Sequence, residues 1–351
     1  MPDALLDLPA SELRDILDAG ASAGPWAREV LEKDLWVVWC LDALFRQPDA
    51  PHYAFKGGTS LSKVYGVIDR FSEDVDVTVS TKDARILGTD DPLDDAISKT
   101  RRKALNERAA ENLRASLTTD LVPYLDEHAT ANLPAWHRPT ITIDDDAPTI
   151  RVTYPSAHAQ TAAAPYIQRN VLLEFGTRGG TEPRSAHTVT TYLERAVELT
   201  DPLTFPKADG VMTLSAERTF WEKATLIHAE IARPGRGLKE RYARHWCDLY
   251  HLSIHSAIGP NALSATEALA QVISMKAKQF HSAGVDYHDC GRGALRLTPD
   301  DHLRTRLRDD YRRMRDSGMF LAEPPTFDDL MEQLHELEST INTTYARAPL
   351  G

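Results

Sequence analysis

The sequence predicts an α/β (α+β) fold, in which a mixed sheet with a helical insertion precedes a mostly helical C-terminal domain. Three observations predict it. Short strand-like runs are spread over residues 52–193. A strongly charged helical pattern interrupts them at about 94–128. From residue 213 onward the apolar spacing is almost entirely helical. We therefore predict two domains, 1–205 and 206–351, the first of which holds N-terminal helices, the sheet and the insertion.

The order of the elements follows from the periodicity of apolar side chains. Spacing of three and four residues predicts a helix over 26–45, and strict alternation predicts a strand over 75–79. Between them, a strand at 52–55 is ended by two glycines, after which a helix follows. Further strands are predicted at 140–143, 150–154, 170–175 and 187–193. Further helices are predicted at 215–231, 239–255, 266–280, 300–315 and 327–343.

Composition excludes several classes of protein. The net charge of -12 argues against a protein that coats nucleic acid without sequence preference. Three short basic stretches are either a local nucleic-acid contact or solvated helix faces: 101–103, 233–244 and 312–315. No run reaches the ~18 apolar residues of a membrane span, and the N-terminus lacks the basic start of a secretory signal. The 3 cysteines include no C-x-x-C pair. We expect a reduced, cytoplasmic protein with neither a membrane nor a DNA partner.

Asp74 and Asp76 form a candidate metal site. Alternate residues of a strand share a face, so these two carboxylates lie side by side while Val75 and Val77 face the core. Two close carboxylates resist ionisation unless a cation lies between them. Hard divalent metals with oxygen ligands, Mg²⁺ above all, meet that requirement.

Gly57-Gly58 is a candidate phosphate cradle. Glycine allows close backbone approach, and N–H groups at the start of a helix attract anions. Thr59 or Ser60 is a candidate cap for the helix, which is expected to run to Tyr65. A phosphate cradle beside a pair of acids is typical of metal-assisted phosphoryl or nucleotidyl transfer. The ordered combination of strand, Gly-Gly, helix and D-x-D strand is far more specific than either motif alone.

The stretch GGTSLSKVYG, followed by DRFSEDVDV, resembles the signature of the polymerase-beta-like nucleotidyltransferase superfamily. More closely, it is similar to the AbiEii/AbiGii toxin family, which includes the MenT toxins of bacterial toxin–antitoxin systems. Further matching segments are 32–34, 173–175, 178–180, 214–224 and 244–249. The resemblance covers about 26–255 and implies a polymerase-beta-like nucleotidyltransferase core joined to a helical domain. No motif covers 256–351.

The resemblance implies a third acid, Glu174, beside Asp74 and Asp76, so that all three hold metal and Glu174 acts as a base or as a ligand of a second metal. Glu174 is the one acid in an apolar strand, where an ionised side chain is costly unless it is paired or bound to metal. The alternative interpretation is an edge-strand glutamate that faces water.

Two further catalytic residues, Lys223 and Asp248, come from the resemblance. It implies that Lys223 reaches the triphosphate and offsets charge on the leaving pyrophosphate. Asp248 would orient neighbouring groups or accept a hydrogen bond. The alternatives are a solvated lysine beside Thr219 and a helix-face aspartate paired with Arg241 or Arg244.

The nucleotide-binding residues implied by the resemblance surround the glycine turn. Lys63 and Arg70 flank the acid pair, where they either contact phosphate or only offset its charge. The full predicted set is Gly57, Gly58, Thr59, Ser60, Lys63, Arg70 and Lys223.

The implied reaction transfers a nucleoside monophosphate from a nucleoside triphosphate, with Mg²⁺ or Mn²⁺, to an RNA acceptor. The resemblance favours the 3′ end of tRNA, which blocks translation, and a cognate antitoxin as a partner. One alternative is transfer to a protein side chain, or phosphorylation, which the acidic net charge favours. The other is a catalytically silent module that only binds nucleotide, against which the joint presence of all three acids and Lys223 speaks.

Overall fold

The computed structural model describes residues 4–48, 52–158, 167–197, 203–233, 238–348 and 350. The chain divides into two compact units. The sheet unit comprises Met1–Val64 and Phe71–Thr213, and the helical unit comprises Tyr65–Arg70 and Leu214–Gly351. The chain therefore leaves the sheet unit after Val64 and returns to it at Phe71. The excursion between them, Tyr65–Arg70, belongs to the helical unit.

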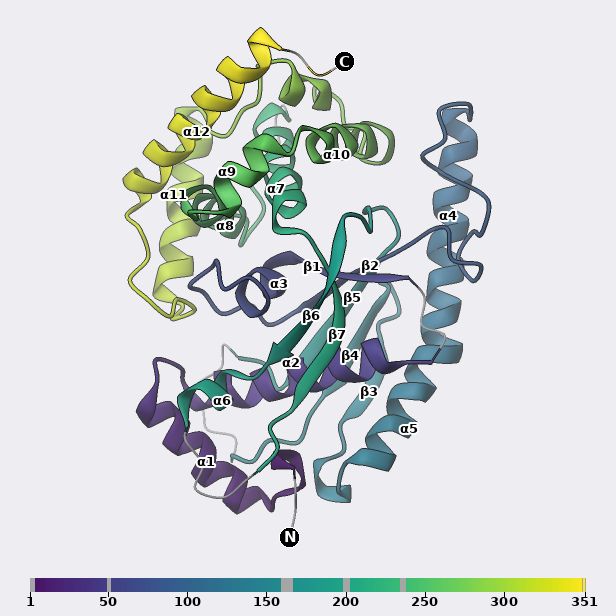
Figure 1. Ribbon diagram of the computed structural model, residues 1–351, viewed down its shortest axis with the longest axis vertical. Coiled ribbons are helices and arrows are strands. Elements are labelled where there is room, and N and C mark those ends of the chain that lie inside the picture. The colour runs from purple at the N-terminus through teal and green to yellow at the C-terminus, as the bar shows by residue number, and fades with distance from the viewer. Residues whose placement is uncertain are drawn as a thin grey trace. The chain divides into compact units, whose positions relative to one another are not determined.

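The sheet unit is built on a 7-stranded sheet in the order β3-β4-β5-β2-β1-β7-β6 (Figure 1). Its strands are β1 (Tyr53–Lys56), β2 (Val75–Val79), β3 (Thr140–Ile143), β4 (Thr149–Thr153), β5 (Asn170–Gly176), β6 (Arg184–Thr190) and β7 (Lys207–Leu214). The pairs β2–β5 and β1–β7 are parallel, whereas β1–β2, β3–β4 and β4–β5 are antiparallel. The sheet is therefore mixed, as predicted, and the α/β fold class is confirmed.

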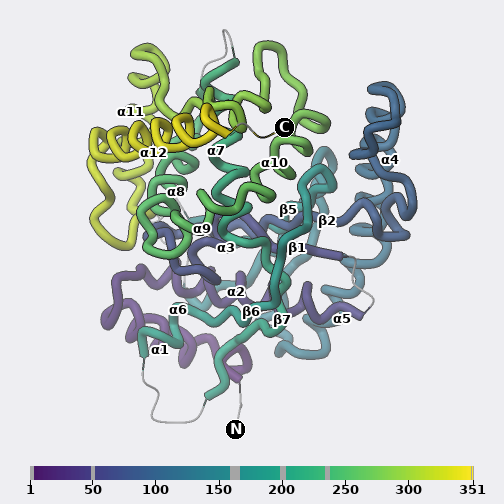
Figure 2. Tube along the Cα trace, turned by 45° about the horizontal axis from the view of Figure 1, so that its top comes forward, coloured from purple at the N-terminus to yellow at the C-terminus, as the bar shows by residue number. Residues whose placement is uncertain are grey.

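Three helices, α1 (Ala10–Ala23), α2 (Arg28–Arg46) and α6 (Tyr192–Ala196), pack against one another (Figures 1 and 2). Helix α2 also packs on β5 and crosses the strands of the sheet in Figure 1. It buries Leu35 and Trp36 completely. This burial explains the helix better than its propensity does, since tertiary packing of an apolar face supplies most helical stability in proteins.

The predicted helical insertion lies between β2 and β3. It consists of α4 (Lys99–Ser116), a π-helical turn (Leu117–Leu121) and α5 (Val122–Asn132). The Ser98 hydroxyl caps α4 by accepting the Arg101 N–H. Leu105, Ala109 and Leu113 form the buried stripe of α4, and the other residues of the helix are exposed or half-buried.

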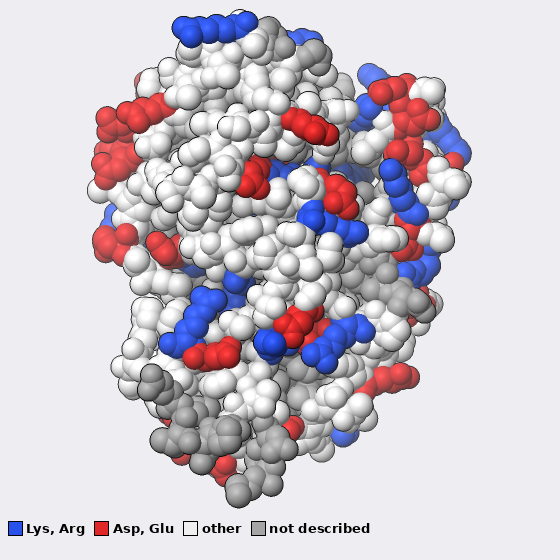
Figure 3. All heavy atoms as spheres, in the orientation of Figure 1, with Lys and Arg blue, Asp and Glu red and all other residues white. Residues whose placement is uncertain are grey.

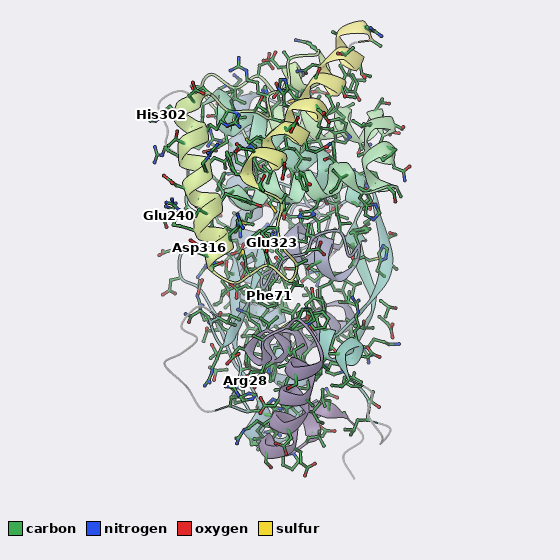
Figure 4. All side chains as sticks on the ribbon, turned by 90° about the vertical axis from the view of Figure 1, so that its left-hand side faces the viewer. Arg28, Phe71, Glu240, His302, Asp316 and Glu323 are labelled. Atoms are coloured by element: carbon green, nitrogen blue, oxygen red, sulfur yellow. The ribbon has the colours of Figure 1, made fainter. Side chains whose placement is uncertain are left out.

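The helical unit is organised around α7 (Ala216–Ala232) and α8 (Ala243–Ile254). The indole N–H groups of the buried Trp221 and Trp246 donate to Ala262 O and Leu297 O, each at 2.9 Å. The other helices are α9 (Ile258–Ser264), α10 (Thr266–Gln279), α11 (Asp301–Asp316) and α12 (Phe327–Arg347). His302 and Asp316 mark the two ends of α11 in Figure 4. Side chains of Ser215, Asp300 and Thr326 cap α7, α11 and α12.

The structure corrects several of the predicted elements. Helix α3 (Gly57–Lys63) begins at the first glycine, so neither predicted hydroxyl caps it. Strand β6 ends at Thr190, and α6, capped by Thr191, replaces the end of the strand predicted at 187–193. Strand β7, where Gly210 breaks the alternation, and α1 were not predicted. Within the described ranges, no helix is both long and apolar enough to span a membrane.

Candidate active site

Asp76 and Glu174 are register partners on the adjacent parallel strands β2 and β5. Facing residues of neighbouring strands project from the same side of a sheet, so the two carboxylates are neighbours. Val75 and Val77 are buried on the other side, as predicted. Glu174 is exposed, but β5 lies between β4 and β2, so the interpretation of Glu174 as an edge-strand residue is wrong. Asp74, half-buried, stands one residue before β2.

Gly57 lies directly against the Asp76 carboxylate. Its φ of 81° is in the left-handed region that glycine tolerates. A Cβ at this position would also fall on Asp76 Oδ2. Glycine is therefore required twice, by backbone conformation and by the closeness of the carboxylate. Lys56, the residue before it, is the register partner of Asp76 on β1.

Thr59 and Ser60 are completely buried, and their hydroxyls bond to nearby groups of the chain. Thr59 Oγ1 lies 2.5 Å from Asp74 O and 2.9 Å from Ser72 Oγ. Ser60 Oγ donates to Gly57 O at 2.9 Å. Thr59 thus ties α3 to the start of the acid-bearing strand, which is a structural role. Gly57 and Gly58 are both half-buried.

Lys63 is paired inside the sheet unit. Its Nζ lies 2.5 Å from Asp34 Oδ1, and both side chains are 1% exposed. The same Nζ stands 3.8 Å from the centroid of the Tyr192 ring. The partner of Lys63 is therefore Asp34 and not the acid pair, and contact of Lys63 with phosphate stays a prediction. Asp34 was given no role from sequence, although an acid in the middle of an apolar helix signals a buried partner.

Arg70, Lys223 and Asp248 meet in the helical unit. Arg70 grips the Asp248 carboxylate with Nε and Nη2, each at 2.8 Å, and Lys223 Nζ donates to Asp248 Oδ2 at 2.7 Å. Asp248 is 0% exposed, Arg70 4% and Lys223 8%. Two buried cations thus share one carboxylate. The partners of Asp248 are not Arg241 or Arg244, and Lys223 is not a solvated lysine.

The charges of this cluster shift the pKa values around it. Burial alone would raise the pKa of Asp248, but the charges and hydrogen bonds of Arg70 and Lys223 outweigh it and hold the pKa far below its ordinary value. Burial, aided by the charge of Lys223, lowers the pKa of His245 well below its ordinary value. His245 lies one turn before Asp248 on α8, and its Nδ1 is buried with no hydrogen-bond partner. Asp248 is therefore ionised and His245 neutral at pH 7.

The donor set suits a metal that arrives with a substrate. Across the described part of the chain, no group of three or more His, Cys, Asp or Glu side chains is arranged to hold a metal ion. Asp76 and Glu174 nevertheless supply two carboxylates in register. Mg²⁺ is usually bound by one or two carboxylates together with substrate phosphates, and not by a cage made of protein alone. The residues therefore fit a magnesium–triphosphate complex better than an isolated ion.

The basic stretches are largely neutralised by neighbouring acids. On α4, Arg101 pairs with Asp90 and Lys103 with Glu107. On α11, Arg312, Arg313 and Arg315 pair with Asp309, Asp310 and Glu323. Lys, Arg, Asp and Glu are interspersed on the face drawn in Figure 3. Part of the stretch at 233–244 lies outside the described residues.

Comparison with known proteins gives one family match. A family model described as "Nucleotidyl transferase AbiEii toxin, Type IV TA system" matches residues 39–333. A solved structure, that of MenT4, a nucleotidyltransferase toxin from Mycobacterium tuberculosis H37Rv, is similar with a TM-score of 0.40 and 14% sequence identity, over 96% of this chain and 99% of that chain. The search of curated proteins found no match. The family match spans every predicted site residue.

Proposed function

Because the chain belongs to the AbiEii nucleotidyl transferase toxin family, we propose that it transfers a nucleoside monophosphate from a nucleoside triphosphate to an RNA acceptor, the 3′ end of tRNA. The family makes the protein a nucleotidyltransferase toxin of a type IV toxin–antitoxin system, and it implies a cognate antitoxin. The placement of Asp76 and Glu174 in register, with Gly57 packed against Asp76, is the observation that supports this active site best.

In the proposed reaction, an acceptor hydroxyl oxygen bonds to the α-phosphorus, and the bond from that phosphorus to the oxygen bridging the β-phosphate breaks. Pyrophosphate leaves. Glu174, which is exposed to solvent, accepts the proton that the hydroxyl loses. Lys223 offsets the charge that develops on pyrophosphate. Asp248 holds the Arg70 and Lys223 side chains by direct hydrogen bonds, and so acts as a positioning residue.

Asp76 and Glu174 are the pair that would hold Mg²⁺, or Mn²⁺ in its place, and Asp74, one residue before β2, remains the proposed third ligand. A bound metal supplies charge neutralisation for the triphosphate and makes the attacking hydroxyl more acidic. The glycine turn remains the predicted contact for the phosphates, through backbone N–H groups. Nucleotide added to a tRNA 3′ end would block its use in translation, which accounts for toxicity.

A protein side chain is the second candidate acceptor. The net charge of -12 and the pairing of basic stretches with acids favour it, because tRNA is bound more readily by a positive surface. The two candidates share the active site and differ only in the group that attacks.

The test incubates the protein with each α-³²P-labelled triphosphate, Mg²⁺ and either total tRNA or nucleic-acid-free cell extract. We expect label in tRNA, and its loss when EDTA is added or when the 3′ diol has been oxidised by periodate. Label in protein bands would establish the second candidate. Triphosphate binding without release of pyrophosphate, across all acceptors, would revive the silent module.

A further inference from the structure

Three consecutive charged residues, Glu32, Lys33 and Asp34, lie buried in the middle of α2, with exposed fractions of 3%, 2% and 1%. Each bonds to a different segment. Glu32 accepts hydrogen bonds from Ser156 Oγ and Ala157 N, both at 2.6 Å. The other two reach the segments that carry the candidate active site.

Lys33 and Asp34 bind the chain on either side of the excursion to the helical unit, Lys33 after it and Asp34 before it. Lys33 Nζ lies 2.6 Å from Glu73 Oε2, just after the excursion and immediately before Asp74. Asp34 Oδ1 lies 2.5 Å from Lys63 Nζ, just before the excursion and at the end of the helix that begins at the glycine turn. Adjacent residues of one helix therefore fix both places where the chain leaves and re-enters the sheet unit.

Tyr192 encloses the ion pair of Asp34 and Lys63. The second oxygen of Asp34, Oδ2, accepts the Tyr192 N–H at 2.6 Å, and the Tyr192 ring covers Lys63 Nζ. Burial raises the pKa of Asp34 and lowers that of Lys63, in each case against the effect of the other partner. Buried ion pairs of this kind are often replaceable by apolar side chains without loss of stability, so stability alone does not account for this pair beside that of Lys33 with the partly exposed Glu73.

We propose that Lys33 and Asp34 are positioning residues for nucleotidyl transfer, a clamp that fixes the acid-bearing strand and the glycine helix relative to each other. This inference rests on the proposed active site. By pairing with Glu73, Lys33 fixes the position of the backbone that leads into Asp74 and Asp76. Through Lys63, Asp34 sets the end of α3, whose first residue packs on Asp76. A hydrogen-bonded ion pair of long side chains has directional bonds that fix the relative positions of the strand and the helix. An apolar pair fills the same volume without such bonds.

The experiment replaces the ion pair while keeping the volume. The double variant Lys33→Met/Glu73→Met removes both charges, so neither is left buried alone. The control is Arg46→Met/Asp42→Met, which removes an ion pair of 2.6 Å from the end of the same helix, where Arg46 is 59% exposed. Measurements are the unfolding temperature, kcat and KM for the triphosphate, and amide hydrogen exchange of peptides covering 71–76.

We expect the clamp variant to keep the wild-type unfolding temperature, to lose kcat by about tenfold or more, and to keep KM within about threefold, with faster exchange at 71–76. Asp34→Asn is expected to lower kcat likewise and to speed exchange at 60–64. The control keeps wild-type values. If the double variant fails to fold, Lys33→Gln/Glu73→Gln takes its place, which also leaves no lone buried charge, with the same expected fall in kcat.

A wild-type kcat in the folded clamp variant overturns the inference, because a merely stabilising pair would give that result. Unchanged exchange at 71–76 overturns it too, and needs no turnover. Failure of the proposed acceptor would show in the wild type, where label would enter protein instead of tRNA. The comparison of variants is then made on that acceptor, so the two failures are distinguishable.

Discussion

Asp76 on β2 faces Glu174 on β5 at the same register position of two parallel strands in the interior of the sheet. Parallel pairing of β2 and β5 joins parts of the chain about a hundred residues apart, so sequence spacing says nothing of this contact. What fixes the relationship is the alternation of each strand, which buries the flanking Val75 and Val77 on one side and Leu173 and Phe175 on β5 likewise. The acids are left together on the other side.

Gly57→Ala is expected to abolish most activity. Its Cβ would occupy the place of the Asp76 carboxylate, and misplacement of a reacting group by about 1 Å costs on the order of 10²-fold in rate. Gly210→Ala is the matched control, since Gly210 has a φ of 72° but open space around its Cβ position. Both variants should lose roughly 1–2 kcal/mol of stability from left-handed strain. Only the first should lose nucleotide transfer, and equal activities would refute the packing argument.

Asp248→Asn is expected to destabilise the protein by about 3–5 kcal/mol, because it leaves Arg70 and Lys223 buried without a counter-charge. Chemical denaturation at pH 7 measures the effect. The pKa of Asp248 is lowered by folding, so its contribution is complete above its ordinary pKa of 3.8 and declines as the pH falls below that value. The difference in unfolding free energy between wild type and variant should therefore become smaller only in strong acid. Glu323→Gln, in an exposed pair with Arg315, should change stability by less than about 1 kcal/mol.

Stability is expected to fall as the pH drops below 6.5, with His245 among the causes. Folding lowers the pKa of His245 from 6.5, so in this range the unfolded chain binds a proton that the folded protein does not. His245→Gln should flatten the slope of unfolding free energy against pH by up to ~1.4 kcal/mol per pH unit. Urea denaturation at pH 7.5, 6.5 and 5.5 gives that slope. His302→Gln, at the exposed start of α11, is the control, and an equal effect of both variants would disprove the assignment.

Much of the fold could be predicted from the sequence because local patterns determine it. The strands at 75–79 and 140–143 match β2 and β3 to the residue. The insertion and the five long C-terminal helices were also predicted. Strand β7 could not be, since Gly210 and two acidic or basic positions blur its alternation, and its pairing with β1 is a tertiary effect.

The candidate site was only partly accessible to sequence reasoning. The motif indicated the glycines, Asp74 and Asp76, strand alternation placed the two aspartates on one face, and the family resemblance implied Glu174. The partners of the charged residues could not be predicted, because Arg70 and Asp248 are 178 positions apart and meet only through folding. The same holds for Lys63 and Asp34, which form a buried ion pair although they are far apart in the sequence.

The most direct test of the catalytic role of the in-register acids is the initial rate of labelled-nucleotide incorporation by Asp76→Asn and Glu174→Gln. The control is Asp209→Asn, a carboxylate on β7 that pairs with Lys207. We predict that each of the first two variants folds normally and loses on the order of 10³-fold or more of the rate, each factor of ten being 1.36 kcal/mol of transition-state stabilisation, while the control is unaffected. Incorporation at the wild-type rate by either Asp76→Asn or Glu174→Gln would contradict the account.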